Sequence, residues 1–257
     1  MLGVLYRFYE RRLIRDIMAK PTPRHVGIIL DGNRRYGRQH GLDDPHDVYQ
    51  IGARKLDELL EWCVDLRIPA ITLWVCSTDN LSRDTKEVSG ILSGIEAKMR
   101  LLANDPQIHS RQVRVRAAGR LELLPAPIIE AIQAAEEATK RYNSVVLTIA
   151  IAYGGREEII DAFRAFLGHQ MQTGKELHDI MQQITPASID RYLYSANLPD
   201  PDLIIRTSGE IRLSGFLLWQ SAQSEFYFSD VYWPAFRKID FLRAIRSYQL
   251  RRRRFGL

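Results

Sequence analysis

The sequence has little cysteine and lacks the common signatures of nucleotide and zinc sites. Its two cysteines, Cys63 and Cys76, have neither CxxC nor zinc-finger spacing, which argues against a disulfide scaffold and is typical of a cytoplasmic protein. The motifs GxGxxG, GxxxxGK[ST] and HExxH are absent, and the six histidines form no metal-ligand pattern. Dinucleotide, P-loop and zinc-protease chemistry therefore fit this chain poorly.

Long hydrophobic runs are also missing. The N-terminal segment MLGVLYRFYERRLIRDIM is apolar, but arginines interrupt it. It is unlike a signal peptide or a transmembrane span, and it is typical of a basic amphipathic helix, which we predict within residues 1–23. We expect this helix to pack on the protein's own surface; the alternative is peripheral contact with the inner face of the membrane.

The composition is that of an ordinary soluble globular protein. The chain has 46% hydrophobic and 26% charged residues and no Pro/Gly/Ser-rich linker, so we predict one catalytic domain over residues 24–257. The formal net charge of +5 favours an anionic partner: phosphates, acidic lipids or nucleic acid. Nucleic acid fits least, because no aromatic residues are interleaved with the basic runs.

Buried strands alternate with helices along the chain. Apolar runs closed by turn residues predict strands at 26–30, 71–76, 113–118, 145–152 and 203–206. Helical spacing of apolar residues predicts helices at 48–66, 86–104, 127–142, about 155–169, 186–194 and 240–254. The alternation indicates an α/β fold with a mostly parallel central sheet flanked by helices.

Polar clusters follow four of these strands. They are Asp31–Arg35, Ser77–Asn80 with Arg83, Tyr153–Arg156 and Arg206–Ser214. The carboxyl ends of parallel strands share one edge of a sheet, so we expect the clusters to converge there. Arg, Ser, Thr, Asn and Gly are residues that hold phosphate oxygens, and convergence would create a phosphate site.

Individual residues in these clusters have simpler interpretations as well. Asp31 could cap a helix, but a carboxylate beside two arginines also suits Mg²⁺ bridging to a diphosphate. Arg206 directly follows an apolar strand, which favours a buried guanidinium that needs an anion. Asn80 could be a turn residue. Glu225 precedes an aromatic run, where it could pair with a structural arginine or serve as a second metal ligand.

Four segments together resemble the cis-prenyltransferase family, of the undecaprenyl diphosphate synthase type. They are HVGIILDGNRR, STDN, IAYGGREEI and DLIIRTSGEIRLSGFLLWQSAQSEFYFSDVYWPAF, and the similarity runs from about Arg24 to Gly256. The resemblance implies a homodimeric enzyme that condenses isopentenyl diphosphate with an allylic diphosphate and forms a Z double bond. It also implies an apolar tunnel for the product, for which the helix faces 51–66 and 88–102 are candidates.

The resemblance assigns roles residue by residue. Asp31 matches the essential aspartate that holds Mg²⁺, Glu225 the second metal contact, and Asn80 the group implicated in proton removal. The C-terminal Arg254-Phe255-Gly256 resembles an Arg-x-Gly end that in some members reaches a partner subunit's site; its alternative is a solvated helix end. The implied substrate-binding residues are Gly32, Asn33, Arg34, Arg35, Tyr36, Tyr49, Ser77, Thr78, Asp79, Arg83, Arg206, Arg212, Leu213 and Ser214.

Some positions depart from the family pattern. Asp79 and Leu81 stand where many members have Glu and Trp, and Tyr49 and Pro45 stand where long-chain members have His and Arg. Val75 replaces a common Ala at the tunnel, where added bulk should shorten the cavity. These features favour a short- to medium-chain product, as in Z-farnesyl diphosphate synthases. The alternatives are a long-chain polyprenyl synthase and a non-catalytic partner subunit.

We interpret the match of one further motif, to trans-prenyl synthases, as a coincidence. Residues 43–47, DDPHD, match the DDxxD letters that all-helical trans-prenyl synthases carry on a helix. Pro45 should break a helix at this point, and the chain is rich in strands, so we do not expect a trans-prenyl site here.

Overall fold

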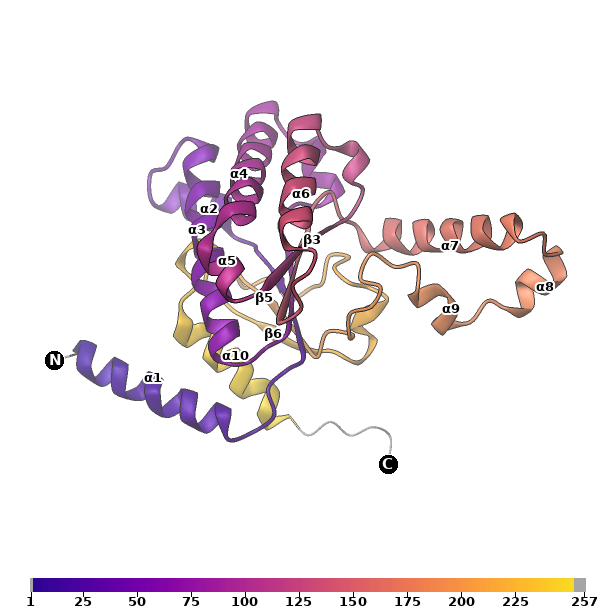
Figure 1. Ribbon diagram of the computed structural model, residues 1–257. Coiled ribbons are helices and arrows are strands. Elements are labelled where there is room, and N and C mark those ends of the chain that lie inside the picture. Colours follow the sequence, from indigo (N-terminus) through magenta and orange to yellow (C-terminus); the bar gives the residue numbers. More distant parts are fainter. Residues whose placement is uncertain (1, 252–257) are drawn as a thin grey trace.

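The computed structural model describes residues 2–251 and shows one six-stranded sheet in the order β3-β4-β2-β1-β5-β6, with every pairing parallel (Figure 1). The strands are β1 (His25–Ile29), β2 (Ala70–Trp74), β3 (Val113–Ala118), β4 (Val145–Ala150), β5 (Leu203–Arg206) and β6 (Glu225–Phe228). The α/β prediction is confirmed, and the sequence pattern had left β6 unassigned.

The register aligns the carboxyl ends of the strands. Ile29, the last residue of β1, lies opposite Trp74 of β2 and Arg206 of β5. Each of the remaining pairings also brings the last residues of its two strands opposite one another. Side chains that follow these residues are therefore delivered to one edge of the sheet, as parallel topology requires.

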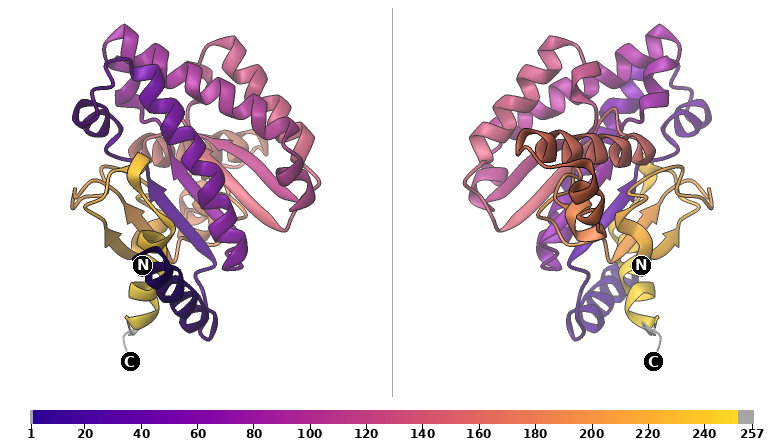
Figure 2. Two further views of the ribbon diagram at one scale, coloured as in Figure 1. Left: turned by 90° about the vertical axis from the view of Figure 1, so that its left-hand side faces the viewer. Right: turned by 90° about the vertical axis from the view of Figure 1, so that its right-hand side faces the viewer.

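Helices cover one face of the sheet and enclose the main core (Figure 2). The longer ones on this face are α3 (Pro45–Asp65), α4 (Thr85–Asn104), α6 (Ala126–Thr139) and α10 (Lys238–Leu250). Their apolar stripes pack on the alternating residues of β1, β2 and β5, such as Ile28, Leu73 and Ile205, all fully buried. The short helices α2 (Asn33–Gln39) and α5 (Pro106–Ser110) lie beside them.

The opposite face carries a smaller cluster and a projecting arm. Phe216 and Leu217 of the loop after β5 pack with Ile29, Ile204 and Tyr153. Helices α7 (Gly155–Gln172), α8 (Leu177–Gln182) and α9 (Pro186–Asp190) extend away from the sheet (Figure 1). Several large apolar side chains on this arm are exposed: Ile160, Leu167, Met171, Leu177, Met181 and Ile184.

The predicted N-terminal helix is present as α1 (Leu2–Met18), beside α10 near the C-terminal end of the described chain (Figure 2). Leu13 and Ile17 are buried, and the Gln249 side-chain amide donates to the Ile17 carbonyl at 3.0 Å. Within residues 2–251, no helix combines the length and hydrophobicity that crossing a membrane requires. The Arg254-Phe255-Gly256 prediction lies outside the described residues.

Two local predictions need correction. Pro45 does not prevent a helix; it begins α3, because the first helical position needs no backbone donor, and Asp44 caps the helix by accepting from the His46 amide at 2.9 Å. Asp43 and Asp44 thus precede the helix rather than riding on it. The helix predicted at 186–194 ends at Asp190, after which the chain continues in turns.

Candidate active site

Asp31 stands just beyond the end of β1, and its backbone is held on both sides. The Asp31 amide donates to Thr207 Oγ1 at 2.9 Å, and the Thr207 hydroxyl donates to the Asp31 carbonyl at 2.6 Å. Gly32 follows with φ of 102°, and a Cβ there would come 2.6 Å from the Tyr232 ring. This turn therefore requires glycine, and it fixes the direction of the Asp31 carboxylate.

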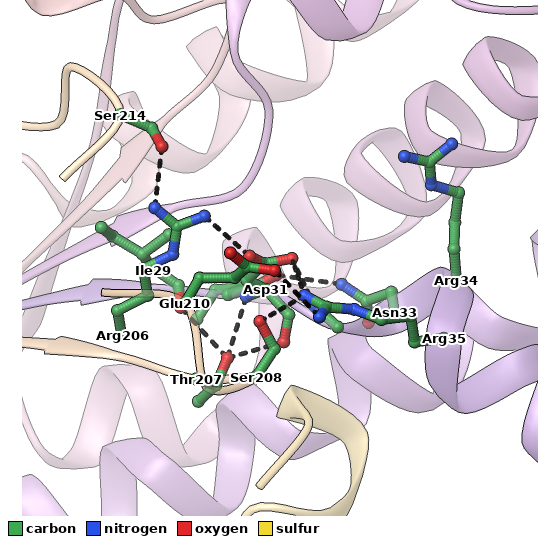
Figure 3. Close-up of polar contacts among 12 residues, drawn as sticks. Ile29, Asp31, Asn33, Arg34, Arg35, Arg206, Thr207, Ser208, Glu210 and Ser214 are labelled. Carbon is green, nitrogen blue, oxygen red and sulfur yellow. Dashed lines mark hydrogen bonds and ion pairs between the residues drawn. The ribbon is translucent and has the colours of Figure 1, made fainter. Parts of the chain in front are cut away.

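Arg206 reaches Asp31 from the end of the neighbouring strand (Figure 3). Its Nη2 donates to Asp31 Oδ2 at 2.8 Å, while Nη1 donates to Ser214 Oγ at 2.7 Å and to the Arg212 carbonyl at 2.5 Å. Arg206 is only 5% exposed, and its Nε has no partner in the described structure. The buried guanidinium predicted here thus has Asp31 as its anion and retains unused hydrogen-bonding capacity.

Asp31 is ionised despite its partial burial. Burial alone would raise the pKa of this carboxyl, but hydrogen bonds from Arg206 and Ser208, the Arg206 charge and the Gly32 amide outweigh it, and the pKa is lowered from its ordinary value. A carboxylate held ionised and partly exposed is ready to bind a divalent cation.

Two further arginines, Arg35 and Arg212, pair with Glu210. Arg35 Nη1 lies 3.1 Å from Glu210 Oε1, and Arg212 Nη1 lies 2.5 Å from Glu210 Oε2. Arg35 also donates to Ser208 Oγ at 2.6 Å, and its Nη2 is 3.5 Å from Asp31 Oδ1. Figure 3 shows Arg35 and Glu210 close to Asp31, whereas Arg34 lies apart from them.

Glu87 of α4 organises the side of the site formed by the helices. Its carboxylate accepts from Arg83 Nη1 at 2.6 Å and from the Tyr49 hydroxyl at 3.2 Å, and it lies 3.4 Å from Arg34 Nε. Burial first, and then the Glu87 charge, raise the pKa of Tyr49. Tyr49 is therefore a neutral hydrogen-bond donor at this site.

The segment after β2 is held by a capping box. Asn80 Oδ1 accepts from the Ser77 amide at 3.0 Å, and the Asn80 amide donates to Ser77 Oγ at 3.2 Å, which caps the 3₁₀ turn Thr78–Ser82. The turn interpretation of Asn80 is thus correct, and the residue also lines the site.

These groups surround one polar cavity of about 550 Å³. It is lined by Asp31, Asp79, Glu210 and the arginines at positions 34, 35, 38, 83, 206 and 212, together with Gly32, Asn33, Tyr49, Trp74, Val75, Ser77, Asn80 and Ser214 among others. The excess of arginine over carboxylate makes it a site for anions with several oxygens, such as diphosphates.

An apolar cavity continues from the polar one between α3 and α4. Leu30, Asn33, Tyr49, Val75 and Ile91 line both. Further in, the lining consists mainly of apolar side chains from the two helix faces that the sequence suggested: Leu56, Ile95 and Met99. The combined space suits a molecule with a polyanionic head and a hydrocarbon tail.

Four residues from the predicted set do not line the polar cavity. Tyr36 stacks on His40 with ring centroids 3.9 Å apart. Thr78 Oγ1 lies near Gly154, and Leu213 packs with the apolar cluster on the second face. Glu225 begins β6, at the opposite edge of the sheet from Asp31, and pairs with Arg251 at 2.6 Å.

The placement of Glu225 matches the simpler of its two interpretations. Parallel pairing sets Glu225 opposite Leu203, the first residue of β5, whereas Arg206 at the other end contacts Asp31. Within one chain, Glu225 and Asp31 cannot share a metal ion in this conformation. Its observed partner within the chain is an arginine, Arg251, and a metal-binding role for Glu225 stays a prediction.

The Tyr153–Arg156 cluster supports the site without lining the polar cavity. Tyr153 is buried, its hydroxyl donates to Glu158 Oε2 at 2.5 Å and accepts from the Leu217 amide at 3.2 Å, and the Gly155 amide donates to the Gly215 carbonyl at 3.0 Å. These bonds hold the loop that carries Ser214.

Several residues of the site had no clear signal in the sequence. Glu87 lies in the first turn of α4, where an acidic residue is common, so nothing marked it as the partner of Tyr49 and Arg83. Arg38 lies on a polar helix face and Trp74 in a buried strand, so nothing marked them as cavity residues. Thr207 and Glu210 lay within the Arg206–Ser214 cluster, but only contacts reveal that one fixes the Asp31 backbone and the other joins two arginines.

Fold and site together suit an enzyme whose substrate has a polyanionic head and a hydrocarbon tail, and comparison with known proteins agrees. The family model described as "Putative undecaprenyl diphosphate synthase" matches residues 29–256. The chain is 50% identical to a tritrans,polycis-undecaprenyl-diphosphate synthase (geranylgeranyl-diphosphate specific) of Methanopyrus kandleri, over 99% of this chain and 92% of that protein. It is 49% identical to the (2Z,6E)-farnesyl diphosphate synthase of Thermobifida fusca, over 98% and 97%.

A solved structure gives the same result. Lavandulyl diphosphate synthase from Lavandula x intermedia, in complex with dimethylallyl diphosphate, superposes with a TM-score of 0.83 at 31% identity, covering 92% of this chain and 99% of that one. The chain belongs to the undecaprenyl diphosphate synthase family, and it is a cis-prenyltransferase.

Proposed function

We propose that the enzyme condenses isopentenyl diphosphate with an allylic diphosphate to make a short- to medium-chain Z-isoprenyl diphosphate. The observation that carries this proposal is the junction of an arginine-rich cavity, centred on Asp31, with an apolar cavity between α3 and α4. A diphosphate head needs the first, and a growing hydrocarbon tail needs the second.

The two diphosphates would use different groups of side chains. Arg206, Arg212 and Ser214 form one group around the loop after β5, which suits isopentenyl diphosphate. The turn and helix after β1, with Gly32, Asn33, Arg34 and Arg35, form the other, which suits the allylic diphosphate. Glu210 now occupies the arginines of both groups, and an incoming diphosphate would compete with it for them.

Mg²⁺ fits this site through Asp31. The described residues contain no group of three or more His, Cys, Asp or Glu side chains able to hold a metal by themselves. Mg²⁺ is commonly bound by one or two carboxylates plus substrate phosphates, and the ionised, partly exposed Asp31 matches that donor set. When bound, the ion would supply charge neutralisation for the leaving diphosphate.

Asn80 would orient a substrate rather than take a proton itself. Its Oδ1 is engaged by the Ser77 amide, which leaves the NH₂ group as the donor available to a phosphate oxygen. Because an amide is not basic, the proton lost from isopentenyl diphosphate would pass to an oxygen of a bound diphosphate, which Asn80, Ser77 and Arg83 would position.

The apolar cavity supports a short product. Its volume of about 60 Å³ is small beside the 550 Å³ of the polar cavity, so a long tail must widen it on entry. Val75 borders the entrance. Z-farnesyl diphosphate synthase of Thermobifida fusca is a relative with a short product; the undecaprenyl synthase of Methanopyrus kandleri keeps the long-chain alternative open.

A homodimer and a peripheral membrane contact complete the proposal. The exposed apolar side chains of the α7–α8 arm, such as Met171 and Met181, are the kind of surface that a second copy would cover.

On α1, Phe8 and Met18 are exposed beside Arg11, Arg12 and Arg15, a combination that suits an anionic lipid surface. Both features agree with a cytoplasmic enzyme working at the inner membrane face.

The test is a condensation assay with purified protein. Labelled isopentenyl diphosphate is incubated with dimethylallyl, geranyl or farnesyl diphosphate, with Mg²⁺ or with EDTA, and products are sized by mass spectrometry. We expect a Mg²⁺-dependent Z-product of few isoprene units. A non-catalytic partner subunit would give no product with any primer, and a long-chain synthase would give a polyprenyl product.

A further inference from the structure

The apolar cavity contains one charged side chain in its described lining, Lys98 of α4. Lys98 is 9% exposed, and its neighbours in the lining include Ile95, Met99 and Leu56. A lysine this deeply buried needs a partner, because an unpaired ammonium in an apolar environment is strongly disfavoured.

Lys98 lies at the end of the cavity away from the diphosphate site. Helix α4 starts at the polar cavity, where Glu87 contacts Tyr49 and Arg83, and Ile91 lines both cavities. From Ile91 to Lys98 the helix advances seven residues, roughly 10 Å at 1.5 Å per residue. A tail that grows inward from the diphosphates therefore meets Lys98 last.

The partner of Lys98 is on the facing helix. Lys98 Nζ donates to Asp57 Oδ1 of α3, in an ion pair that bridges the two helices enclosing the cavity. The Lys98 side chain is only 10% exposed and that of Asp57 is 48% exposed, so a buried ammonium depends on a carboxylate nearer the surface, while the aliphatic stem of Lys98 faces the cavity. Nearer the entrance the same helices present Ala53 and Gly94, which are too small to block the cavity.

We propose that the Lys98–Asp57 ion pair closes the product tunnel and sets the maximum length of the prenyl chain. This inference rests on the proposed function. A tail that extends past Met99 would have to separate α3 from α4 at this level, and it would remove the ammonium from its carboxylate in the process. Burying the unpaired charge opposes the gain from burying one more isoprene unit, and elongation stops there.

Three variants separate charge, bulk and helix bridging. Lys98→Ala removes all three, and we expect the main product to lengthen by at least one isoprene unit. Lys98→Met keeps an unbranched side chain without charge and should lengthen it less. Asp57→Asn leaves the lining untouched and weakens the bridge from outside, so longer products should appear as a minor fraction.

The matched control is Arg100→Ala. Arg100 is an exposed cation on the same helix, paired with Glu96 one turn away at 2.9 Å, with no ion pair to α3. Its product distribution should equal that of the wild type. A merely structural ion pair would lower the melting temperature in Lys98→Ala and leave product length unchanged; that result, in a folded and active variant, overturns the proposal.

A binding series provides a readout that needs no turnover. Saturated alkyl diphosphates of increasing length are titrated into wild type and Lys98→Ala. The affinity of the wild type should rise with the length of the alkyl chain and then stop rising. The affinity of Lys98→Ala should continue to rise beyond that chain length. Identical cut-offs would overturn this inference, even if the wild type catalyses condensation; absence of wild-type turnover, in contrast, would refute only the proposed function.

Discussion

The two walls of the polar cavity differ in how firmly they are held. The sheet-edge wall contains Asp31 and Arg206 at the ends of β1 and β5. Hydrogen bonds of 2.6–2.9 Å join Asp31 to Arg206 and to the fully buried Thr207. The helix wall contains Arg34 and Arg83, whose shared partner Glu87 lies outside the cavity lining. Arg83 is 2.6 Å from Glu87, but Arg34 comes no nearer than 3.4 Å, and its side chain is 54% exposed.

This difference separates two tasks. Charge that develops on a leaving group is best stabilised by groups that are already in place. Asp31 and Arg206 of the sheet-edge wall are held in this way. Exposed ion pairs with long contacts are weak and can re-form around a ligand, and the Arg34–Glu87 pair of the helix wall is of this kind. We therefore expect substitutions at the sheet edge to affect the chemical step and those on the helix wall to affect binding.

The largest effect should follow Asp31→Ala. Loss of the carboxylate removes the proposed Mg²⁺ contact and leaves Arg206 without its anion, and we expect about 3 kcal/mol less transition-state stabilisation, a rate lower by about a hundredfold or more. Steady-state assays with saturating Mg²⁺ measure this. Asp31→Asn is the isosteric control and should be nearly as slow; wild-type rates in either variant would contradict the assignment.

Arg206→Lys should have the next largest effect. Lysine keeps the charge but cannot span Asp31, Ser214 and the Arg212 carbonyl as the planar guanidinium does. We expect kcat to fall by about tenfold or more, equivalent to roughly 1.4 kcal/mol of activation free energy, because Asp31 loses its fixed partner. Arg116→Lys is the control, since Arg116 donates to the Tyr194 and Ala196 carbonyls outside the cavity; an equal loss of kcat in that variant would contradict a specific role for Arg206.

On the helix wall, Glu87→Gln should change little. Glutamine preserves the shape of Glu87 but loses the ion pairs with Arg34 and Arg83, which are partly exposed and worth at most about 1 kcal/mol each. We expect kcat within about fivefold of wild type, with the change concentrated in the KM for the allylic diphosphate. A loss in kcat as large as that of Asp31→Ala would show that the two walls do not differ as proposed.

The last effect concerns stability rather than catalysis. His25 begins β1 and is buried; its Nδ1 contacts the Pro199 carbonyl at 2.7 Å and its Nε2 contacts Thr72 Oγ1 at 2.8 Å. Burial lowers its pKa. As pH falls, His25 is therefore protonated in the unfolded chain before it is protonated in the folded one. The stability that neutral His25 provides at pH 7 decreases below a pH of about 6.5.

The expected slope is at most about 1.4 kcal/mol of unfolding free energy for each pH unit, over the window between the unfolded and folded pKa of His25. Urea unfolding between pH 7 and pH 5 measures it. His25→Gln keeps hydrogen-bonding atoms without a titrating group and should flatten the slope, while an unchanged slope would assign the effect to other residues.

The strand ends were predictable from sequence. A parallel strand is buried on both faces, so it appears in the sequence as a continuous apolar run that stops where the strand ends. That pattern placed Asp31 and Arg206 correctly, and the α3 and α4 tunnel faces followed from helical spacing. Pro45 was misjudged, because a proline that breaks a helix interior is well suited to its first position.

What sequence could not provide is pairing between distant residues. The sequence shows Glu225 next to an aromatic run, but only the register of β6 reveals that Glu225 is the first residue of the strand, far from Asp31. Glu87 and Lys98 look like ordinary polar positions of an amphipathic helix until Tyr49 and Asp57 of α3 are brought opposite them. Such contacts arise from helix packing, which no local pattern specifies.

The most direct measurement is a single-turnover comparison of Asp31→Ala and Glu87→Gln under identical conditions, with enzyme in excess and both diphosphates and Mg²⁺ saturating. The sheet-edge variant should be slower than the helix-wall variant by at least about twentyfold, the ratio of a hundredfold loss to a fivefold one. Equal single-turnover rates would contradict the claim that the ends of β1 and β5 carry the chemistry.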